Sequence, residues 1–215
     1  MHFIPEKLDE YVVAHSQPEP ELLQKLRRET YQKILQPRML SGHYQGRLLS
    51  MLSKIINPNT ILEIGTYTGY SALCLAEGMK PDGKLHTIDV NEELMDFQKK
   101  YFDASEYASQ IFQHLGDARE IIPQIEATYD LVFIDADKPN YPAYFDIIID
   151  RLNPGGIILS DNVLWSGKVI EPLKKGDIST EALLVYNRLL AEDDRLETVV
   201  LPIRDGLTIS RRKYA

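Results

Sequence analysis

The chain has 215 residues, 44% of them hydrophobic and 26% charged, a composition typical of a globular domain that buries its own core. Its 24 basic and 32 acidic residues give a formal charge of −8, which disfavours a general nucleic-acid coat or a polybasic membrane binder. The single cysteine, Cys74, excludes an internal disulfide framework and a zinc site built from cysteines. No apolar run reaches the roughly 18 residues of a membrane span, and the N-terminal sequence has no secretion signal. We therefore expect a cytoplasmic protein without a membrane partner.

The N-terminal part is predicted to be helical. Apolar residues recur at helical spacing from Leu22 to Leu35, and Pro37 ends that stretch. A second helix is expected over residues 43–56, before the breaker cluster 57–59. We assign residues 1–58 to an N-terminal helical segment within a single domain spanning residues 1–215.

From residue 59 onward, short apolar runs alternate with helical stretches, which predicts a mostly parallel, doubly wound sheet. The first five strands are expected at residues 61–64, 85–88, 111–115, 130–134 and 156–160. The helices are expected at residues 71–78, 92–102, 118–126, 141–152 and 180–191. Two further strands, 196–201 and 207–211, have too few residues between them for a crossover helix, so they are predicted to pair antiparallel.

The first strand runs into a glycine-rich turn, Glu63-Ile64-Gly65-Thr66-Tyr67-Thr68-Gly69-Tyr70-Ser71. Such glycines let a ligand approach the backbone, and the helix that follows offers free N–H groups. The spacing differs from the G-x-G-x-x-G of dinucleotide sites, which disfavours a nicotinamide-dependent oxidoreductase. Glu63 would repel a pyrophosphate but suits a cationic amino or sulfonium group. A plain strand–turn–helix with glycines for geometry is the alternative.

Two later strand ends carry further candidate residues. Asp89 follows the turn by about 20 residues, where a carboxylate commonly binds ribose hydroxyls, although it is equally suited to the N-terminus of the next helix. Gly116-Asp117-Ala118 follows the third strand. This segment is placed to lie along an adenine edge, or to cap the next helix through Asp117.

Polar residues cluster after the fourth and fifth strands. Asp135 and Lys138 follow one strand, and Asp161 and Asn162 follow the other, at the sheet edge where open α/β folds bind ligands. Asp135, Asp161 and Asn162 offer only oxygen ligands, which suit Mg²⁺ or Ca²⁺. Lys138 is placed to act as a base beside such an ion. The alternative is that these carboxylates only cap helices.

These motifs together resemble the class I S-adenosylmethionine (SAM)-dependent O-methyltransferases, in particular the caffeoyl-CoA and catechol O-methyltransferase group. The resemblance is carried by Glu63-x-Gly65-x-x-x-Gly69-x-Ser71, Asp89, Asp135-Ala136-Asp137-Lys138, Asp161-Asn162-Val163-Leu164-Trp165, Met39-Leu40-Ser41 and the tail 201–209. It covers residues 37–212, and Arg204 departs from it, because plant members tend to have glycine there. In the family, the N-terminal segment and the region of Arg204 border the acceptor pocket, so the resemblance implies that residues 1–58 contribute to the acceptor site.

The resemblance implies a Rossmann-like sheet of seven strands, with the last strand antiparallel, helices on both faces and extra N-terminal helices. It implies that SAM is bound by Met39, Ser41, Glu63, Gly65, Thr66, Ser71, Asp89, Gly116, Ala118 and Asp135. It implies Asp135, Asp161 and Asn162 as ligands of a divalent cation (Mg²⁺, Ca²⁺ or Mn²⁺) and Lys138 as the catalytic base. Since caffeoyl-CoA-type relatives are usually dimers, it also implies a homodimer.

We therefore predict metal-dependent methyl transfer from SAM to a hydroxyl of a catechol-like or other vicinal-diol aromatic small molecule. The cation would bind both substrate oxygens, and Lys138 would remove the proton. The same residues fit methylation of a hydroxylated uridine in tRNA, against which the charge of −8 argues weakly. A nicotinamide-dependent oxidoreductase and a non-catalytic binding module are the alternatives from other classes.

Overall fold

The computed structural model describes residues 5–214, and its contacts divide the chain into two compact units that meet in sequence between Asp117 and Ala118. Each unit is described by itself. Residues 1–4 and 215, which begin and end the predicted domain, lie outside the described residues. Within residues 5–214, no helix is both long enough and apolar enough to cross a membrane. The assignment of residues 1–215 to one domain stays a prediction.

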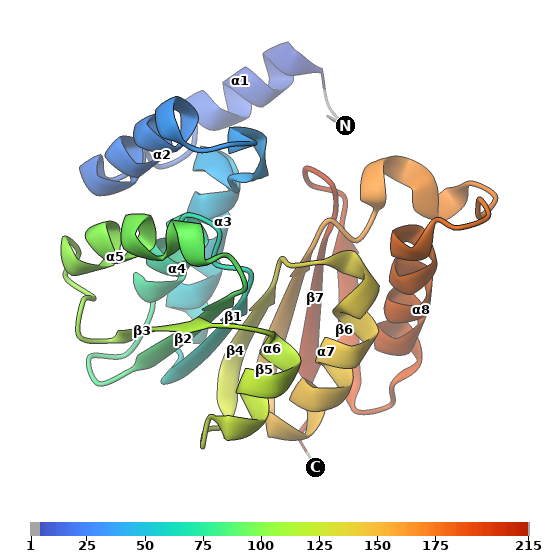
Figure 1. The fold of residues 1–215 in the computed structure, drawn as a ribbon. Helices are drawn as coiled ribbons and strands as arrows, with labels where there is room; N and C mark the ends of the chain where they lie inside the picture. Colours follow the sequence, from blue (N-terminus) through green and yellow to red (C-terminus); the bar gives the residue numbers. More distant parts are fainter. Residues whose placement is uncertain (1–4, 215) are drawn as a thin grey trace. The chain divides into compact units, whose positions relative to one another are not determined.

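The first unit contains the N-terminal helices and three parallel strands (Figure 1). Its elements are α1 (Glu6–Ala14), α2 (Glu21–Lys33), the 3-10 helix η1 (Pro37–Met39), α3 (Gly42–Ile56), β1 (Thr60–Ile64), α4 (Tyr70–Ala76), β2 (Lys84–Asp89), η2 (Glu92–Leu94), α5 (Met95–Asp103) and β3 (Ile111–Leu115). Strand β2 pairs in parallel with both β1 and β3. Every residue of α4 is buried, and α3 packs against it.

The buried carboxylate of Glu19 connects helix α2 to helix α4 through hydrogen bonds. Glu19, just ahead of α2, accepts hydrogen bonds from the Arg27 guanidinium at 3.0–3.1 Å and from the Tyr70 hydroxyl at 2.5 Å. A carboxylate that is buried in this way needs such partners to offset its lost hydration. The N-terminal segment is therefore tied to the first residue of α4, directly after the glycine-rich turn.

The second unit contains four strands, with α7 and α8 packed on each other (Figure 1). Its elements are α6 (Ala118–Ile121), η3 (Ile122–Gln124), β4 (Tyr129–Ile134), η4 (Lys138–Asn140), α7 (Tyr141–Ile148), η5 (Ile149–Arg151), β5 (Leu152–Asp161), η6 (Trp165–Ile170), α8 (Ile178–Glu192), β6 (Leu196–Leu201) and β7 (Leu207–Arg212). Strand β4 is parallel to β5, whereas β7 is antiparallel to both β5 and β6. The seven strands belong to one sheet in the order β3-β2-β1-β4-β5-β7-β6. The predicted fold class, including the antiparallel last strand, is confirmed.

Two predicted helices are too long. The helix expected over residues 118–126 ends at Ile121 and continues only as a 3-10 turn, because Pro123 has no N–H to extend the helical hydrogen bonds. The helix expected over residues 141–152 ends at Ile148, and Leu152 is the first residue of β5. The fifth strand thus begins four residues earlier than its apolar run, which starts at residue 156.

Candidate functional site

The glycine-rich turn of the first unit has a backbone that other residues would strain. Gly65 and Gly69 have φ values of +98° and +86°, in the left-handed region. A Cβ atom at Gly69 would lie 2.7 Å from the Phe102 ring. The N–H of Gly65 donates to the Ile88 carbonyl at 2.9 Å, which ties the turn to β2. The turn thus requires glycine at both positions.

A chain of short hydrogen bonds holds the acidic residue that precedes this turn. The Thr87 hydroxyl donates to Glu63 Oε2 at 2.5 Å, and it lies 2.5 Å from the Thr66 hydroxyl. Glu63 and Thr87 are cross-strand partners in the β1–β2 register. Because the single proton of Thr87 goes to the carboxylate, Thr66 must donate to Thr87. The Glu63 carboxylate is therefore buried and fixed in orientation.

Asp89 joins the ends of β2 and β3 to the turn. Its Oδ2 atom accepts from the Tyr67 N–H at 2.7 Å, and its Oδ1 atom accepts from the Asn91 N–H at 2.9 Å. Its carbonyl oxygen accepts from the Gly116 N–H at 2.8 Å. Asp89 is thus hydrogen-bonded to Tyr67 of the turn and to Gly116, and Gly65 is hydrogen-bonded to the residue before Asp89, Ile88.

The other predicted cofactor residues lie on neighbouring elements. Ser71 is buried in the first turn of α4, Met39 is an exposed residue at the end of η1, and Ser41 is buried just ahead of α3. Ala118 opens α6 of the second unit. A residue that the sequence did not single out, Tyr67, connects this region. Its hydroxyl lies 3.2 Å and 3.1 Å from the carbonyl oxygens at positions 35 and 36, shortly before Met39.

In the second unit, Lys138 has three hydrogen-bond acceptors. Its Nζ atom donates to Asp135 Oδ1 at 3.2 Å, to the Ala136 carbonyl at 3.1 Å and to the Tyr141 hydroxyl at 2.7 Å. The side chain is 7% exposed. Three acceptors match the three protons of an ammonium group, so these contacts are those of a buried ion pair. The role of Lys138 as a base stays a prediction.

Tyr141, which the sequence did not single out, connects the ends of two strands. Its hydroxyl lies 3.2 Å from the carbonyl oxygen of Ile134, the last residue of β4, and 3.0 Å from that of Asp161, the last residue of β5. Burial raises the pKa of the phenol well above its usual range, and the nearby carboxylates of Asp135 and Asp161 raise it further. The hydroxyl therefore keeps its proton. The only signal in the sequence is a tyrosine three residues after Lys138.

Asp161 and Asn162 end β5 in a fixed turn. Asp161 is 3% exposed, and its Oδ1 atom accepts from the Asn162 N–H at 2.9 Å. Asn162 has φ +60°, a left-handed conformation that asparagine tolerates better than most residues. Among the described residues there is no group of three or more His, Cys, Asp or Glu side chains arranged to hold a metal ion. A set of two carboxylates and one amide, all oxygen donors, fits a hard cation such as Mg²⁺.

The loop that follows Asn162 is held by the tip of the β6–β7 hairpin. The Leu164 N–H donates to the Asp205 carbonyl at 3.0 Å, and the Ser166 N–H donates to Asp205 Oδ1 at 2.5 Å. A Cβ atom at Gly206 would lie 2.4 Å from the Leu164 side chain. The hairpin that marks the family resemblance therefore fixes the loop after the predicted metal ligands.

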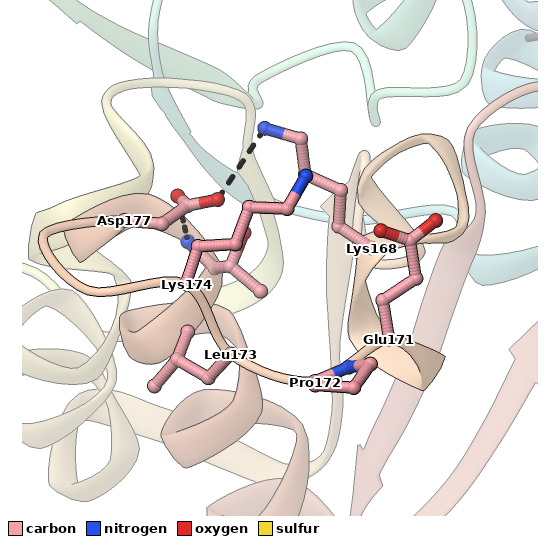
Figure 2. Close-up of a pocket in the computed structure, with 7 residues that line it drawn as sticks. Lys168, Glu171, Pro172, Leu173, Lys174 and Asp177 are labelled. Carbon is pink, nitrogen blue, oxygen red and sulfur yellow. Dashed lines mark hydrogen bonds and ion pairs between the residues drawn. The ribbon is translucent and has the colours of Figure 1, made fainter.

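A small surface pocket lies further along the same loop, and its lining contains none of the predicted site residues. Figure 2 shows Lys168 and Asp177 facing each other there, with Nζ and Oδ2 3.4 Å apart. Asp177 also caps α8 by accepting from the Thr180 N–H at 3.1 Å. The Lys168 ammonium lies 5.8 Å from the centre of the Trp165 ring. The ion pair that lines the pocket thus connects η6 to the N-terminus of α8.

Cys74 and His114 lie among residues of the fold and outside the predicted site. Cys74 is fully buried in α4, and burial raises the pKa of its thiol to about 12, so it is not a reactive nucleophile. His114 Nε2 lies 3.1 Å from His86 Nδ1 on the neighbouring strand. The interpretation of Cys74 as a core residue is confirmed.

Both the sequence and the fold have close counterparts among known proteins. A model of the O-methyltransferase family matches residues 13–213. Caffeoyl-CoA O-methyltransferase 5 of Nicotiana tabacum is 37% identical over 205 residues, which cover 90% of this chain and 85% of the tobacco protein. The structure of the O-methyltransferase TomG from Streptomyces achromogenes, in complex with SAM, is 28% identical with a TM-score of 0.88, and 97% of this chain and 96% of that chain are covered. The structure of the O-methyltransferase from Bacillus cereus in complex with SAH is 29% identical with a TM-score of 0.89. The match covers 96% of this chain and 97% of that chain.

Proposed function

Because the chain belongs to the O-methyltransferase family, we propose that it transfers a methyl group from SAM to a hydroxyl of a catechol-like or other vicinal-diol aromatic small molecule, assisted by a divalent cation. The observation that carries the proposal is the joined set of Asp135, Lys138 and Tyr141 at the end of β4, with Asp161 and Asn162 at the end of the neighbouring strand β5. Two similar methyltransferases were solved with SAM or SAH, and the tobacco relative is a caffeoyl-CoA O-methyltransferase.

The first unit supplies most of the residues proposed to bind SAM, which brings a methyl group on a positively charged sulfur, whereas Ala118 and Asp135 belong to the second unit. Glu63 presents a buried carboxylate in a fixed orientation, which suits a cationic group. Asp89 presents a second carboxylate at the end of β2, placed for ribose hydroxyls. The left-handed turn at Gly65 leaves no side chain between the ligand and the backbone.

The second unit supplies the residues for a divalent cation. Asp135, Asp161 and Asn162 would hold it through oxygen atoms, as Mg²⁺, Ca²⁺ or Mn²⁺ require. Such a cation would supply Lewis-acid chemistry there, which would make a substrate hydroxyl easier to deprotonate. A vicinal-diol acceptor suits this arrangement, because it offers two adjacent oxygens to one ion.

Lys138 would take the proton of the acceptor hydroxyl on its Nζ atom. To do so it must enter the reaction as a neutral amine, which can donate only two hydrogen bonds instead of the three observed. The acceptor hydroxyl would therefore replace one of these three contacts. A buried amine held by neighbours loses little further conformational freedom when it turns toward a substrate.

A direct assay tests the proposal. The protein is incubated with SAM, a panel of catechols and hydroxyuridine-containing tRNA, with Mg²⁺ or with EDTA. We expect methylated catechol only when Mg²⁺ is present, and an unchanged circular dichroism spectrum in EDTA. Full activity in EDTA would contradict the requirement for a divalent cation. Methylation of tRNA but of no catechol would identify hydroxylated uridine in tRNA as the acceptor. The homodimer and the cytoplasmic location stay predictions.

A further inference from the structure

We propose that Tyr141 is a positioning residue that holds the two strand ends of the cation site at a fixed spacing and keeps the Lys138 amine in place. The inference rests on the proposed function, because it concerns the same site. Tyr141 is itself neither a ligand nor a base, and its role is carried by one buried hydroxyl.

The first argument concerns the place where the two strands separate. Strands β4 and β5 are paired up to Ile134 and Ser160, and the predicted ligands Asp135 and Asp161 follow immediately. Beyond this pair, the sheet between β4 and β5 no longer fixes their separation. The Tyr141 hydroxyl lies within hydrogen-bonding distance of the carbonyl oxygens of Ile134 and Asp161, so it bridges the ends of β4 and β5.

The second argument concerns the direction of the hydrogen bonds. The Lys138 ammonium can only donate, so the Tyr141 oxygen accepts from it at 2.7 Å. The phenol proton is then left for the two carbonyl oxygens. One hydroxyl group thus connects Lys138, the end of β4 and the end of β5. Without it, two carbonyl groups lose a donor and the amine loses its shortest contact.

The third argument concerns the rigidity of the ring. Tyr141 is fully buried, and its ring meets the Tyr186 ring edge-to-face, with the ring centres 5.2 Å apart. A ring that is packed in this way holds its hydroxyl in one place without help from the ligand. Supporting contacts of this kind orient metal ligands, and their removal typically weakens metal affinity about 10–100-fold.

The test compares two variants that each remove one buried phenol oxygen. Tyr141→Phe removes the bridge, whereas Tyr186→Phe removes an equally buried hydroxyl whose hydrogen bond, within the described residues, is with the Ser160 side chain at 2.6 Å. Mn²⁺ binding is measured by electron paramagnetic resonance, and thermal melting is recorded alongside. We expect Tyr141→Phe to weaken Mn²⁺ binding about 10-fold or more. We expect Tyr186→Phe to bind Mn²⁺ as the unmodified protein does, even if both variants melt earlier.

Equal Mn²⁺ affinity in Tyr141→Phe and the unmodified protein would overturn the inference. If the unmodified protein itself does not bind Mn²⁺, or if Asp161→Ala binds it equally well, the proposed cation site fails instead. A second measurement does not depend on the stability of a variant. With 3-fluorotyrosine at position 141, the fluorine resonance should shift on addition of Mg²⁺, whereas the same label at position 186 should not respond. An unresponsive label at position 141 would also overturn the inference.

Discussion

Asp89 of the first unit and Lys138 of the second unit are held in place by different means. In the first unit, backbone N–H groups of Tyr67, Asn91 and Gly116 converge on Asp89, and two left-handed glycines shape the turn. In the second unit, side chains do this work, since Lys138 and Tyr141 connect the strand ends. The backbone donors of Asp89 survive many side-chain replacements, whereas the position of Lys138 depends on the side chains of Asp135 and Tyr141.

This difference orders the expected effects of substitution. Removing one side chain of the network in the second unit breaks several contacts at once. Removing one carboxylate in the first unit leaves the turn, its glycines and its backbone hydrogen bonds in place. The largest loss of activity is therefore expected at Lys138 and a smaller one at Glu63.

Lys138→Ala should lower kcat by about 10²–10⁴-fold, because that is the usual effect of removing a general base. SAM affinity should change far less than kcat, since among the described residues Asp135 is the one predicted SAM residue to which Lys138 donates a hydrogen bond. Steady-state kinetics and calorimetry with SAM measure both quantities. Lys99→Ala is the matched control, because its ion pair with Asp103 is exposed and on α5.

Lys138→Arg separates the base from the ion pair. Arginine keeps the positive charge but cannot be deprotonated in a protein. If Lys138 is the base, the arginine variant should be as inactive as Lys138→Ala. Substantial activity in Lys138→Arg would show that the residue acts only through its charge and its contact with Asp135.

Glu63→Gln should weaken SAM binding by about 1–3 kcal/mol, the usual loss when a charged hydrogen bond becomes a neutral one. The variant keeps the size of the side chain and its partner Thr87, so the fold should be retained. Calorimetry with SAM measures the change, and Asp103→Asn provides an exposed carboxylate as a control. Unaltered SAM affinity in Glu63→Gln would assign this buried carboxylate to the core instead.

The local geometry of the first site could be predicted from the sequence more fully than that of the second, for a physical reason. Glycine spacing is a local signal, because only glycine adopts the backbone conformation seen at Gly65 and Gly69 at little cost. The position of the candidate ligands Asp135, Asp161 and Asn162 after strand ends was also predicted, and their role as ligands stays a prediction. The role of Tyr141 was not, because it depends on the direction in which one ring points from the start of α7.

Element boundaries were predicted least well where two signals compete. Strand β5 begins at Leu152, ahead of Pro154, Gly155 and Gly156, which ordinarily mark a turn. Parallel pairing of Leu152 with Tyr129 extends the strand across that segment, with an irregular register between residues 129 and 131. Long-range pairing of this kind cannot be read from a local pattern.

Glycine-to-alanine substitutions test how firmly the hairpin tip holds the loop after Asn162. Gly206 and Gly176 have φ values of +88° and +84°, so alanine strains both by about 1–2 kcal/mol. Only at Gly206 does the new methyl group meet a neighbour, Leu164, which adds about 1–3 kcal/mol of overpacking. Chemical denaturation should show the larger loss in Gly206→Ala. Equal losses of stability in Gly206→Ala and Gly176→Ala would show that the tip of the β6–β7 hairpin shifts to accommodate the methyl group at little cost.

Acid should affect the first unit through an imidazole that is neutral in the fold. Burial, then His114 and Lys84, lower the pKa of His86 from 6.5 to about 4. Between these values the unfolded chain binds a proton that the folded chain does not, so stability falls as pH decreases from 6.5 to 4. For this partly exposed ring we expect roughly 1 kcal/mol between pH 7 and pH 5. His86→Gln removes the titrating ring, so the variant should lose less stability over this range than the unmodified protein in denaturant titrations at the two pH values. An equal loss in both proteins would assign the acid sensitivity of the first unit to groups other than His86.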